Sequence, residues 1–196
     1  MELREVLDRR RMVRNYEDRP VPVEALERIL DAGTRAPSAG NTQGVTLVVV
    51  TDAGRRSTIA DRAGEGDYVA RGFEPWLGRA PVHVVVCTSE RAYRERYAED
   101  DKPTADVDAW TVPYWWVDAG AAFQNLLLAA VDEGLAAGFL GAHAIPGLAD
   151  AVGLPDDVAP LGVVTIGHPA PDRRSGSLDR GRRADAVRRE TWEVIG

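Results

Sequence analysis

The chain contains almost no cysteine and almost no lysine. Cys87 is the only cysteine among 196 residues, which excludes a disulfide framework and a cysteine-based metal site. It lies in the apolar run PVHVVVCTS, and such a run favours a buried, inert thiol over a nucleophile. The three histidines lie far apart and lack the spacing of metal ligands, so we expect no metal. Lys102 is the only lysine, and arginine supplies the rest of the 24 lysine and arginine residues.

The chain also lacks an apolar leader and any hydrophobic run long enough to span a bilayer. We therefore expect a cytoplasmic protein. Its formal net charge is -7 at pH 7, which disfavours binding to nucleic acid or to an anionic membrane. The hydrophobic fraction of 44% and the charged fraction of 28% are ordinary for a globular protein, and no boundary divides residues 1–196, so we expect a single domain.

Three common motifs of nucleotide and hydrolase sites are absent from the sequence. There is no GxGxxG after a strand, no GxxxxGK[ST] and no GxSxG, so a dinucleotide-binding fold, a nucleotide triphosphatase and a serine hydrolase lose their usual support. Acids on the helix predicted at 114–133, Asp118 among them, are expected to be structural or solvated. We therefore predict no catalytic side chain, a pattern that suits an enzyme whose cofactor carries the reaction.

Hydrophobic periodicity predicts helices alternating with strands, which indicates an α/β or α+β sandwich. The helix at 114–133 is apolar on nearly all sides, so it is expected in the centre of the fold or at an interface. Segment 64–78 is rich in glycine and charge and is predicted to be a loop or lid, and the polar segment 90–111 is predicted to be an exposed excursion. The other predicted helices are 1–10, 22–36 and 54–63, and the predicted strands are 46–51, 82–88, 135–140 and 161–166.

Arginines gather near the N-terminus, in the stretch RRRMVRNY at 9–16. Arg10, Arg11 and Arg14 are placed to converge on one anion, and phosphate is the anion that suits the guanidinium fork. The alternative is a solvated, arginine-rich surface. A later cluster, RGRRADAV at 180–187, would by itself be a solvated segment.

A second candidate for ligand binding is PSAGNTQ at 37–43, directly before a predicted strand. Its backbone N–H groups and the amides of Asn41 and Gln43 offer the donors and acceptors that a planar, hydrogen-bonding ligand requires. The alternative is a helix stop followed by a turn, because Gly40 and Asn41 are common turn residues.

Three segments together resemble the nitroreductase family of flavin enzymes. RRRMVRNYEDRPVPVEALERILDAGTRAPSAGNTQ at 9–43 is similar to the family's opening. VDAGAAFQNLLLAAVDEGLAAGFLG at 117–141 resembles its central helix and following strand, and LGVVTIGHPA at 161–170 resembles its last core strand. The resemblance implies an α+β fold, a three-layer α-β-α sandwich with a mostly antiparallel sheet. It also implies an intertwined homodimer with FMN at the interface, and a C-terminal tail, from about residue 170, that packs on the partner.

The resemblance also assigns roles to residues of this sequence. Arg10 and Arg11 would hold the FMN phosphate, and Arg14 the ribityl and pyrimidine side. The 37–43 loop would reach FMN, often from the other subunit, and Arg182 or Arg183 would close on the phosphate. Met12 stands where many members have serine, so one hydrogen bond to the phosphate is expected to be missing. Gly44 and Val45 stand where many have Pro-Trp or Pro-Tyr, so the wall near the 37–43 loop is expected to be more open. The implied cofactor-binding residues are Arg10, Arg11, Met12, Arg14, Pro37, Ser38, Ala39, Asn41, Gln43, Leu140, Gly141, Arg182 and Arg183.

The activity implied by the resemblance is that of an FMN-dependent oxidoreductase. Hydride would pass from NADH or NADPH through flavin N5 to an electron-poor small molecule by a ping-pong mechanism, with a nitroaromatic, quinone or conjugated alkene as acceptor. Alternatives are a flavin-modifying or reductive-dehalogenase-type member of the same fold, or a non-catalytic FMN storage protein. Aromatic residues near the glycine-rich and polar segments are candidate walls of the acceptor pocket, although each could instead pack in the core. They are Tyr68, Phe73, Trp76, Trp110 and Tyr114.

Overall fold

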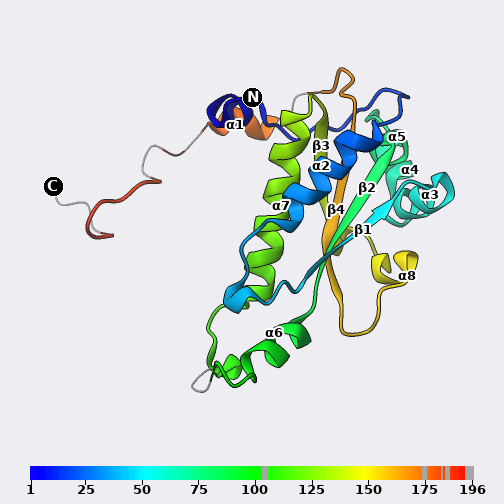
Figure 1. The fold of residues 1–196 in the computed structure, drawn as a ribbon. Helices are drawn as coiled ribbons and strands as arrows, with labels where there is room; N and C mark the ends of the chain where they lie inside the picture. The colour runs from blue at the N-terminus through cyan, green and yellow to red at the C-terminus, as the bar shows by residue number, and fades with distance from the viewer. Residues whose placement is uncertain (103–105, 174–175, 182, 184–185, 193–196) are drawn as a thin grey trace.

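A four-stranded antiparallel sheet lies between two layers of helices (Figure 1). The computed structural model describes residues 1–102, 106–173, 176–181, 183 and 186–192. The strand order is β1-β2-β4-β3. This three-layer α+β architecture confirms the predicted fold class. The strands are β1 (Val45–Val50), β2 (Val82–Thr88), β3 (Ala136–Gly141) and β4 (Ala159–Gly167).

Two long helices cover one face of the sheet, and several short ones cover the other (Figure 1). The first layer consists of α2 (Val23–Thr34) and α7 (Tyr114–Asp132), with α1 (Leu3–Arg9) near the end of α7. The second layer consists of α3 (Ala53–Arg62), α4 (Glu65–Ala70), α5 (Trp76–Arg79) and α8 (Leu148–Val152). Helix α6 (Glu90–Tyr97) extends past the sheet toward the start of α7. Short 3₁₀ turns are η1 (Ala39–Asn41), η2 (Val107–Ala109), η3 (Ala142–Ala144) and η4 (Gly176–Arg180).

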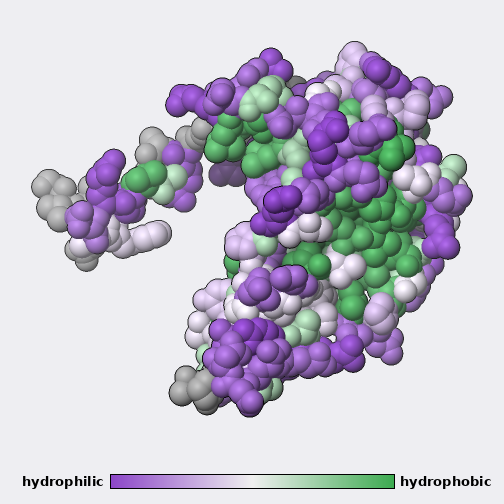
Figure 2. Space-filling model, viewed as in Figure 1, coloured by the Kyte–Doolittle hydropathy of each residue, from purple (hydrophilic) through white to green (hydrophobic). Residues whose placement is uncertain are grey.

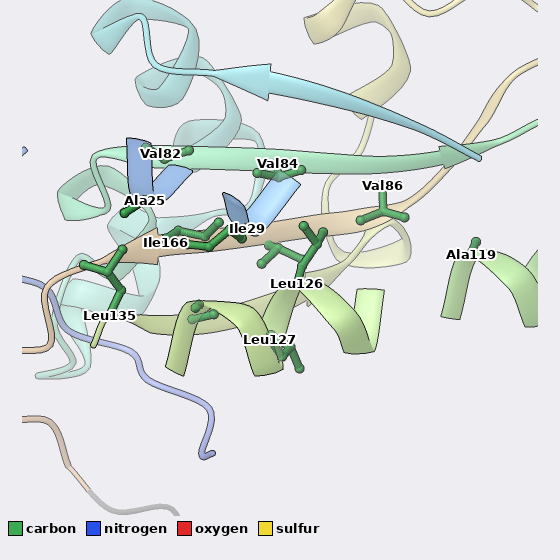
Figure 3. Close-up of a cluster of buried hydrophobic side chains, with 13 residues drawn as sticks. Ala25, Ile29, Val82, Val84, Val86, Ala119, Leu126, Leu127, Leu135 and Ile166 are labelled. Atoms are coloured by element: carbon green, nitrogen blue, oxygen red, sulfur yellow. The ribbon is translucent and has the colours of Figure 1, made fainter. Parts of the chain in front are cut away.

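Strand β2 is buried along its whole length because helices cover both of its faces. Alternate residues of a strand point to opposite faces. Val82, Val84 and Val86 therefore pack with α2 and α7 (Figure 3), whereas Val85 and Cys87 pack with the short helices. This two-sided burial explains why β2 appears in the sequence as one continuous apolar run.

A glycine allows α2 and α7 to pack closely. A Cβ on Gly33 would lie 2.8 Å from Cδ2 of Leu126 and 3.0 Å from Cδ1 of Leu47. Ile29 of α2 and Leu126 of α7, both fully buried, belong to one cluster that packs against this face of the sheet (Figure 3). The central position predicted for the helix at 114–133 is therefore confirmed.

The strands and long helices match the predictions to within about two residues, but two segments do not. The segment 64–78 contains α4 and α5, so its interpretation as a loop or lid is wrong, and the segment 90–111, predicted to be an exposed excursion, begins with the helix α6. Glu65 accepts hydrogen bonds from the backbone N–H groups of Leu77 (2.6 Å) and Gly78 (2.9 Å), and the side chain of Tyr93 is fully buried. Tertiary contacts thus stabilise helices whose own sequences are too polar to reveal them.

Cys87 is fully buried, as predicted. Burial raises the pKa of its thiol to about 12. Among the helices of the described chain, none is both long and apolar enough to cross a membrane.

The C-terminal segment leaves the three layers as an arm (Figures 1 and 2). Its start is anchored, because the N–H of Ala170 donates to the carbonyl of Asn15 at 3.2 Å. Farther along, Val187 is 75% exposed and Trp192 is 84% exposed. That this tail packs on a partner stays a prediction.

His83 is buried in β2 with only one of its ring nitrogens bonded. Nε2 donates to the carbonyl of Leu77 at 2.8 Å, and Nδ1 has no hydrogen-bond partner in the described part of the chain. Burial lowers the pKa of His83 from 6.5 to about 4, because the protonated ring would lose its hydration and lie near Arg56.

We expect this histidine to make the protein less stable in acid. Between pH 6.5 and pH 4 the unfolded chain binds a proton at His83 that the folded chain does not, so stability falls as the pH falls. The loss is complete near pH 4 and amounts to about 3 kcal/mol. Urea unfolding at pH 7, 5.5 and 4 should show that His83→Leu removes this part of the pH dependence. The same pH dependence in both proteins would contradict the assignment.

Candidate functional site

The arginine segment lies against the first residues of β3. The N–H of Val13 donates to the carbonyl of Ala137 at 3.0 Å, and Met12 forms a parallel bridge with the same residue. Gly138 makes this close approach possible, because a Cβ there would collide with the carbonyl oxygen of Val13. Arg10 is half-buried beside this contact, and Arg11 and Arg14 are exposed.

Asp172 fixes the position of the arginine segment. Its carboxylate accepts from Nη1 of Arg11 at 2.6 Å and from the backbone N–H of Arg14 at 3.0 Å. Asn15 adds a second tie, because its Nδ2 donates to the carbonyl of Pro171 at 2.7 Å. In contrast, the guanidinium of Arg14 has no hydrogen bond or ion pair to any residue that the structure describes. It lies 5.9 Å from the centre of the Trp76 ring, so its charge is available to a ligand.

A pocket of about 450 Å³ opens beside Arg14. The rings of Tyr68 and Phe73 stack in its wall with centroids 4.3 Å apart, and the guanidinium of Arg173 lies 5.7 Å from the Phe73 ring. Trp76, predicted as a pocket wall, does not line this pocket: it is 5% exposed and packs in the core with Val13 and Tyr16. The pocket is lined by Arg14, Tyr68, Gly72, Phe73, Glu74, Pro171, Asp172, Arg173 and Gly176.

The loop at 37–43 has an unusual backbone conformation. Gly40, Asn41 and Gln43 have positive φ angles of 63°, 55° and 53°. Such angles are uncommon for residues other than glycine. Oγ of Ser38 accepts from the N–H of Gln43 at 2.9 Å and so closes the loop, and Pro37 precedes it. The side chains of Asn41 and Gln43 are exposed, with their amides 3.3 Å apart.

Two side chains hold this loop from behind. The Asp118 carboxylate accepts from the N–H of Ala39 at 2.8 Å, and Nε of Arg96 donates to the carbonyl of Gly40 at 2.9 Å. Arg96 was not among the predicted site residues, and Asp118 was expected only to be structural or solvated. The only signal for Asp118 was an acid within an otherwise apolar stretch of helix.

The arginine segment and the loop lie at opposite ends of the sheet. The arginine segment adjoins Ala137, which is level with Val82 in β2 through Ile166 of β4. The loop leads into Val45, which pairs with Thr88 at the other end of β2. Six residues of strand separate these positions, a distance of about 20 Å. Within one chain, the two predicted parts of the site are therefore not brought together.

The predicted acceptor-pocket aromatics are divided in the same way. Tyr68 and Phe73 lie beside Arg14, whereas Trp110 and Tyr114 lie near the loop. The Trp110 ring contacts the rings of Tyr97 and Tyr114 edge-on, with centroids 4.8 and 5.1 Å away.

The remaining predicted residues have different positions. Leu140 and Gly141 end β3 and are partly exposed. Arg183 is exposed in the C-terminal arm, and Arg182 lies outside the described residues.

The family model described as the nitroreductase family matches residues 7–168. The chain belongs to the nitroreductase family. A putative NADH dehydrogenase/NAD(P)H nitroreductase of Archaeoglobus fulgidus is 28% identical over 187 residues, which cover 93% of this chain and 94% of that protein. An FMN reductase [NAD(P)H] of Bacillus subtilis is 33% identical over 168 residues, which cover 82% of this chain and 63% of that protein.

A solved structure shows the same fold. The hypothetical oxidoreductase YcnD from Bacillus subtilis superposes with a TM-score of 0.76 at 30% identity, over 100% of this chain and 76% of that one. The resemblance proposed from the sequence is thus confirmed at the level of family and fold.

Proposed function

We propose that this nitroreductase family member is an NAD(P)H-linked flavin oxidoreductase whose FMN lies between two copies of the chain. The observation that carries the proposal is the separation of about 20 Å between two sets of exposed binding groups. The arginine segment would come from one copy and the 37–43 loop from the other. The names of the relatives support the cofactor, since one is an FMN reductase and a Vibrio harveyi relative is an NADPH-flavin oxidoreductase.

The arginine segment has the chemistry to hold a phosphate. Arg10, Arg11 and Arg14 place three cations within five residues, and guanidinium–phosphate hydrogen bonds are strong because both partners are charged. Met12 offers no side-chain donor. From Ala137 to Gly141 the strand β3 runs about 13 Å, which leads from this phosphate site toward the proposed position of the flavin ring at Leu140 and Gly141.

The loop has the chemistry to hold a ring edge with mixed donors and acceptors. The amides of Asn41 and Gln43 are exposed, and Nε2 of Gln43 donates to Oδ1 of Asn41 at 3.3 Å, so the two amides lie together at the surface. No other element of the described chain covers them. We infer that a second copy presents its flavin to them.

Bound FMN would supply hydride transfer from NAD(P)H to an electron-poor acceptor such as a nitroaromatic, a quinone or a conjugated alkene. The protein's part is binding, orientation and charge. Arg14, whose guanidinium has no hydrogen bond or ion pair to any described residue, is placed to hold the negatively charged phosphate beside the pocket. The aromatic group around Trp110 would provide a surface on which a planar acceptor stacks.

An apolar surface on the first helical layer supports the dimer. Val117 of α7 is 50% exposed near the start of that helix, and Leu3 and Leu7 of α1 are exposed about 20 Å away, at the end of α7 that holds Asp132. Exposed apolar groups on a buried-type helix are typical of protein interfaces. The C-terminal arm, which extends away from the three layers of its own chain, would pack on the second copy.

FMN binding and the role of Arg14 can be tested together. Arg14→Ala removes a charge-assisted interaction of about 1.5–3 kcal/mol, so FMN affinity should fall about ten-fold or more. Arg9→Ala is the matched control, because Arg9 lies in the same cluster but pairs with Glu5 on the surface of α1. Fluorescence-quenching titrations measure both. Wild-type affinity in Arg14→Ala, or a wild-type protein that ignores FMN, would contradict the proposal.

The shared site predicts complementation between two defective variants. Arg14→Ala and the double variant Asn41→Ala/Gln43→Ala should each bind FMN poorly. Mixed after mild unfolding and refolding, they should form heterodimers with one intact site, and about one quarter of the wild-type sites should return. Flavin content after gel filtration measures the recovery. No recovery, with heterodimers present, would show that the two segments do not complete one site across the dimer and would contradict the proposal.

The role of Trp110 is a third test. Trp110→Ala should raise the acceptor KM, while FMN content and the rate of reduction by NAD(P)H stay nearly unchanged, because ping-pong half-reactions are separable. Stopped-flow measurement of each half-reaction decides the matter. An equal loss of rate in both half-reactions would show that Trp110 has a structural role in this region instead.

A further inference from the structure

Helix α6 packs directly on the 37–43 loop and the glycine after it. Tyr93 and Tyr97 lie one helical turn apart, and their rings lie against Gly44 and Gly40. A Cβ on Gly44 would be 2.5 Å from Cε2 of Tyr93, and a Cβ on Gly40 would be 2.7 Å from Cε2 of Tyr97. The two glycines therefore leave room for two rings. The wall beside Gly44, which was expected to be open, is filled by Tyr93.

Asp118 connects this helix, the central helix and the loop. Its side chain comes from α7 and is only 7% exposed. Oδ2 accepts two hydrogen bonds, one from the N–H of Ala39 at 2.8 Å and one from the hydroxyl of Tyr93 at 2.6 Å. These two donors offset the cost of burying the carboxylate.

The Tyr93 hydroxyl is a fixed donor in this arrangement. Burial, and next its hydrogen bond to Asp118, raise the pKa of Tyr93 well above its usual range. The ring of Trp115 lies 6.3 Å from that of Tyr93, so the pair is enclosed on the side of the aromatic group as well.

The loop needs such support because its conformation is strained. Asn41 and Gln43 have positive φ angles, and strained backbone persists only where the surrounding structure enforces it. Loss of the bond to Ala39 would leave fewer contacts to enforce this conformation of the turn.

We propose that Asp118 and Tyr93 are positioning residues of the flavin site, which hold the 37–43 loop in the conformation that presents Asn41 and Gln43 to FMN. This inference rests on the proposed function. It assigns a role in cofactor binding to α6, a helix that the sequence analysis did not predict.

A purely structural role for Asp118 would affect stability alone. The test therefore compares FMN affinity and the visible circular dichroism of bound flavin, which reports the surroundings of the ring. Asp118→Ala should weaken FMN binding about ten-fold or more and change the dichroism. Asp118→Asn keeps an oxygen that accepts from Ala39, so its affinity should stay within about three-fold of wild type. Ile59→Ala creates a cavity on the other face of the sheet and is the control for lost stability. It should leave FMN affinity and the dichroism unchanged.

A second variant perturbs the same contact without removing any polar group. Gly44→Ala places a methyl where the Tyr93 ring lies, so it should reproduce the changed dichroism and weakened binding of Asp118→Ala, even if the latter fails to fold. Wild-type affinity and dichroism in both Asp118→Ala and Gly44→Ala would overturn this inference and leave the proposed function standing. A wild-type protein that binds no FMN would overturn the proposed function and this inference with it.

Discussion

The burial of both faces of the sheet determines where this protein can bind a ligand. Strands β2 and β4 lie in the middle of the sheet between two helical layers, and β2 has no exposed residue. An uncompensated polar group in such a layer is costly. Groups that contact solvent are therefore confined to the edges and the two ends of the sheet. The arginine segment and the 37–43 loop occupy opposite ends.

Each end is stabilised in a different way. At the arginine end, Gly138 allows the backbone of residues 12–13 to lie against β3. Asp172, which follows β4 in the sequence, holds the segment through its hydrogen bond with Arg11. At the loop end, a buried carboxylate and two tyrosine rings support a strained turn. In both places the groups that support the backbone are buried or paired, and those left exposed are the ones suited to a ligand. Arg14 and Gln43, far apart in one chain, therefore both present exposed side chains.

Much of this structure could be predicted from the sequence, for identifiable reasons. The four strands appear as apolar runs because helices cover both faces, and the long helices appear through their 3.6-residue periodicity. Helix α6 could not be found this way, since its sequence ERAYRERY contains few apolar positions and its main core contact is Tyr93. The importance of Asp118 was also hidden, because its partner Ala39 is 79 residues away. The separation of the two binding segments depends on strand register, which no local pattern reveals.

The deep burial of the lone cysteine has a practical consequence for spectroscopy. Because the Cys87 thiol has a pKa of about 12 and is buried between the sheet and the second helical layer, it will not react with thiol-directed reagents in the folded protein. A cysteine introduced at any exposed position would then be the sole point of attachment for a spin label or fluorophore. The native background needs no prior substitution, so the C-terminal arm can be tracked by distance measurements in the otherwise unaltered chain.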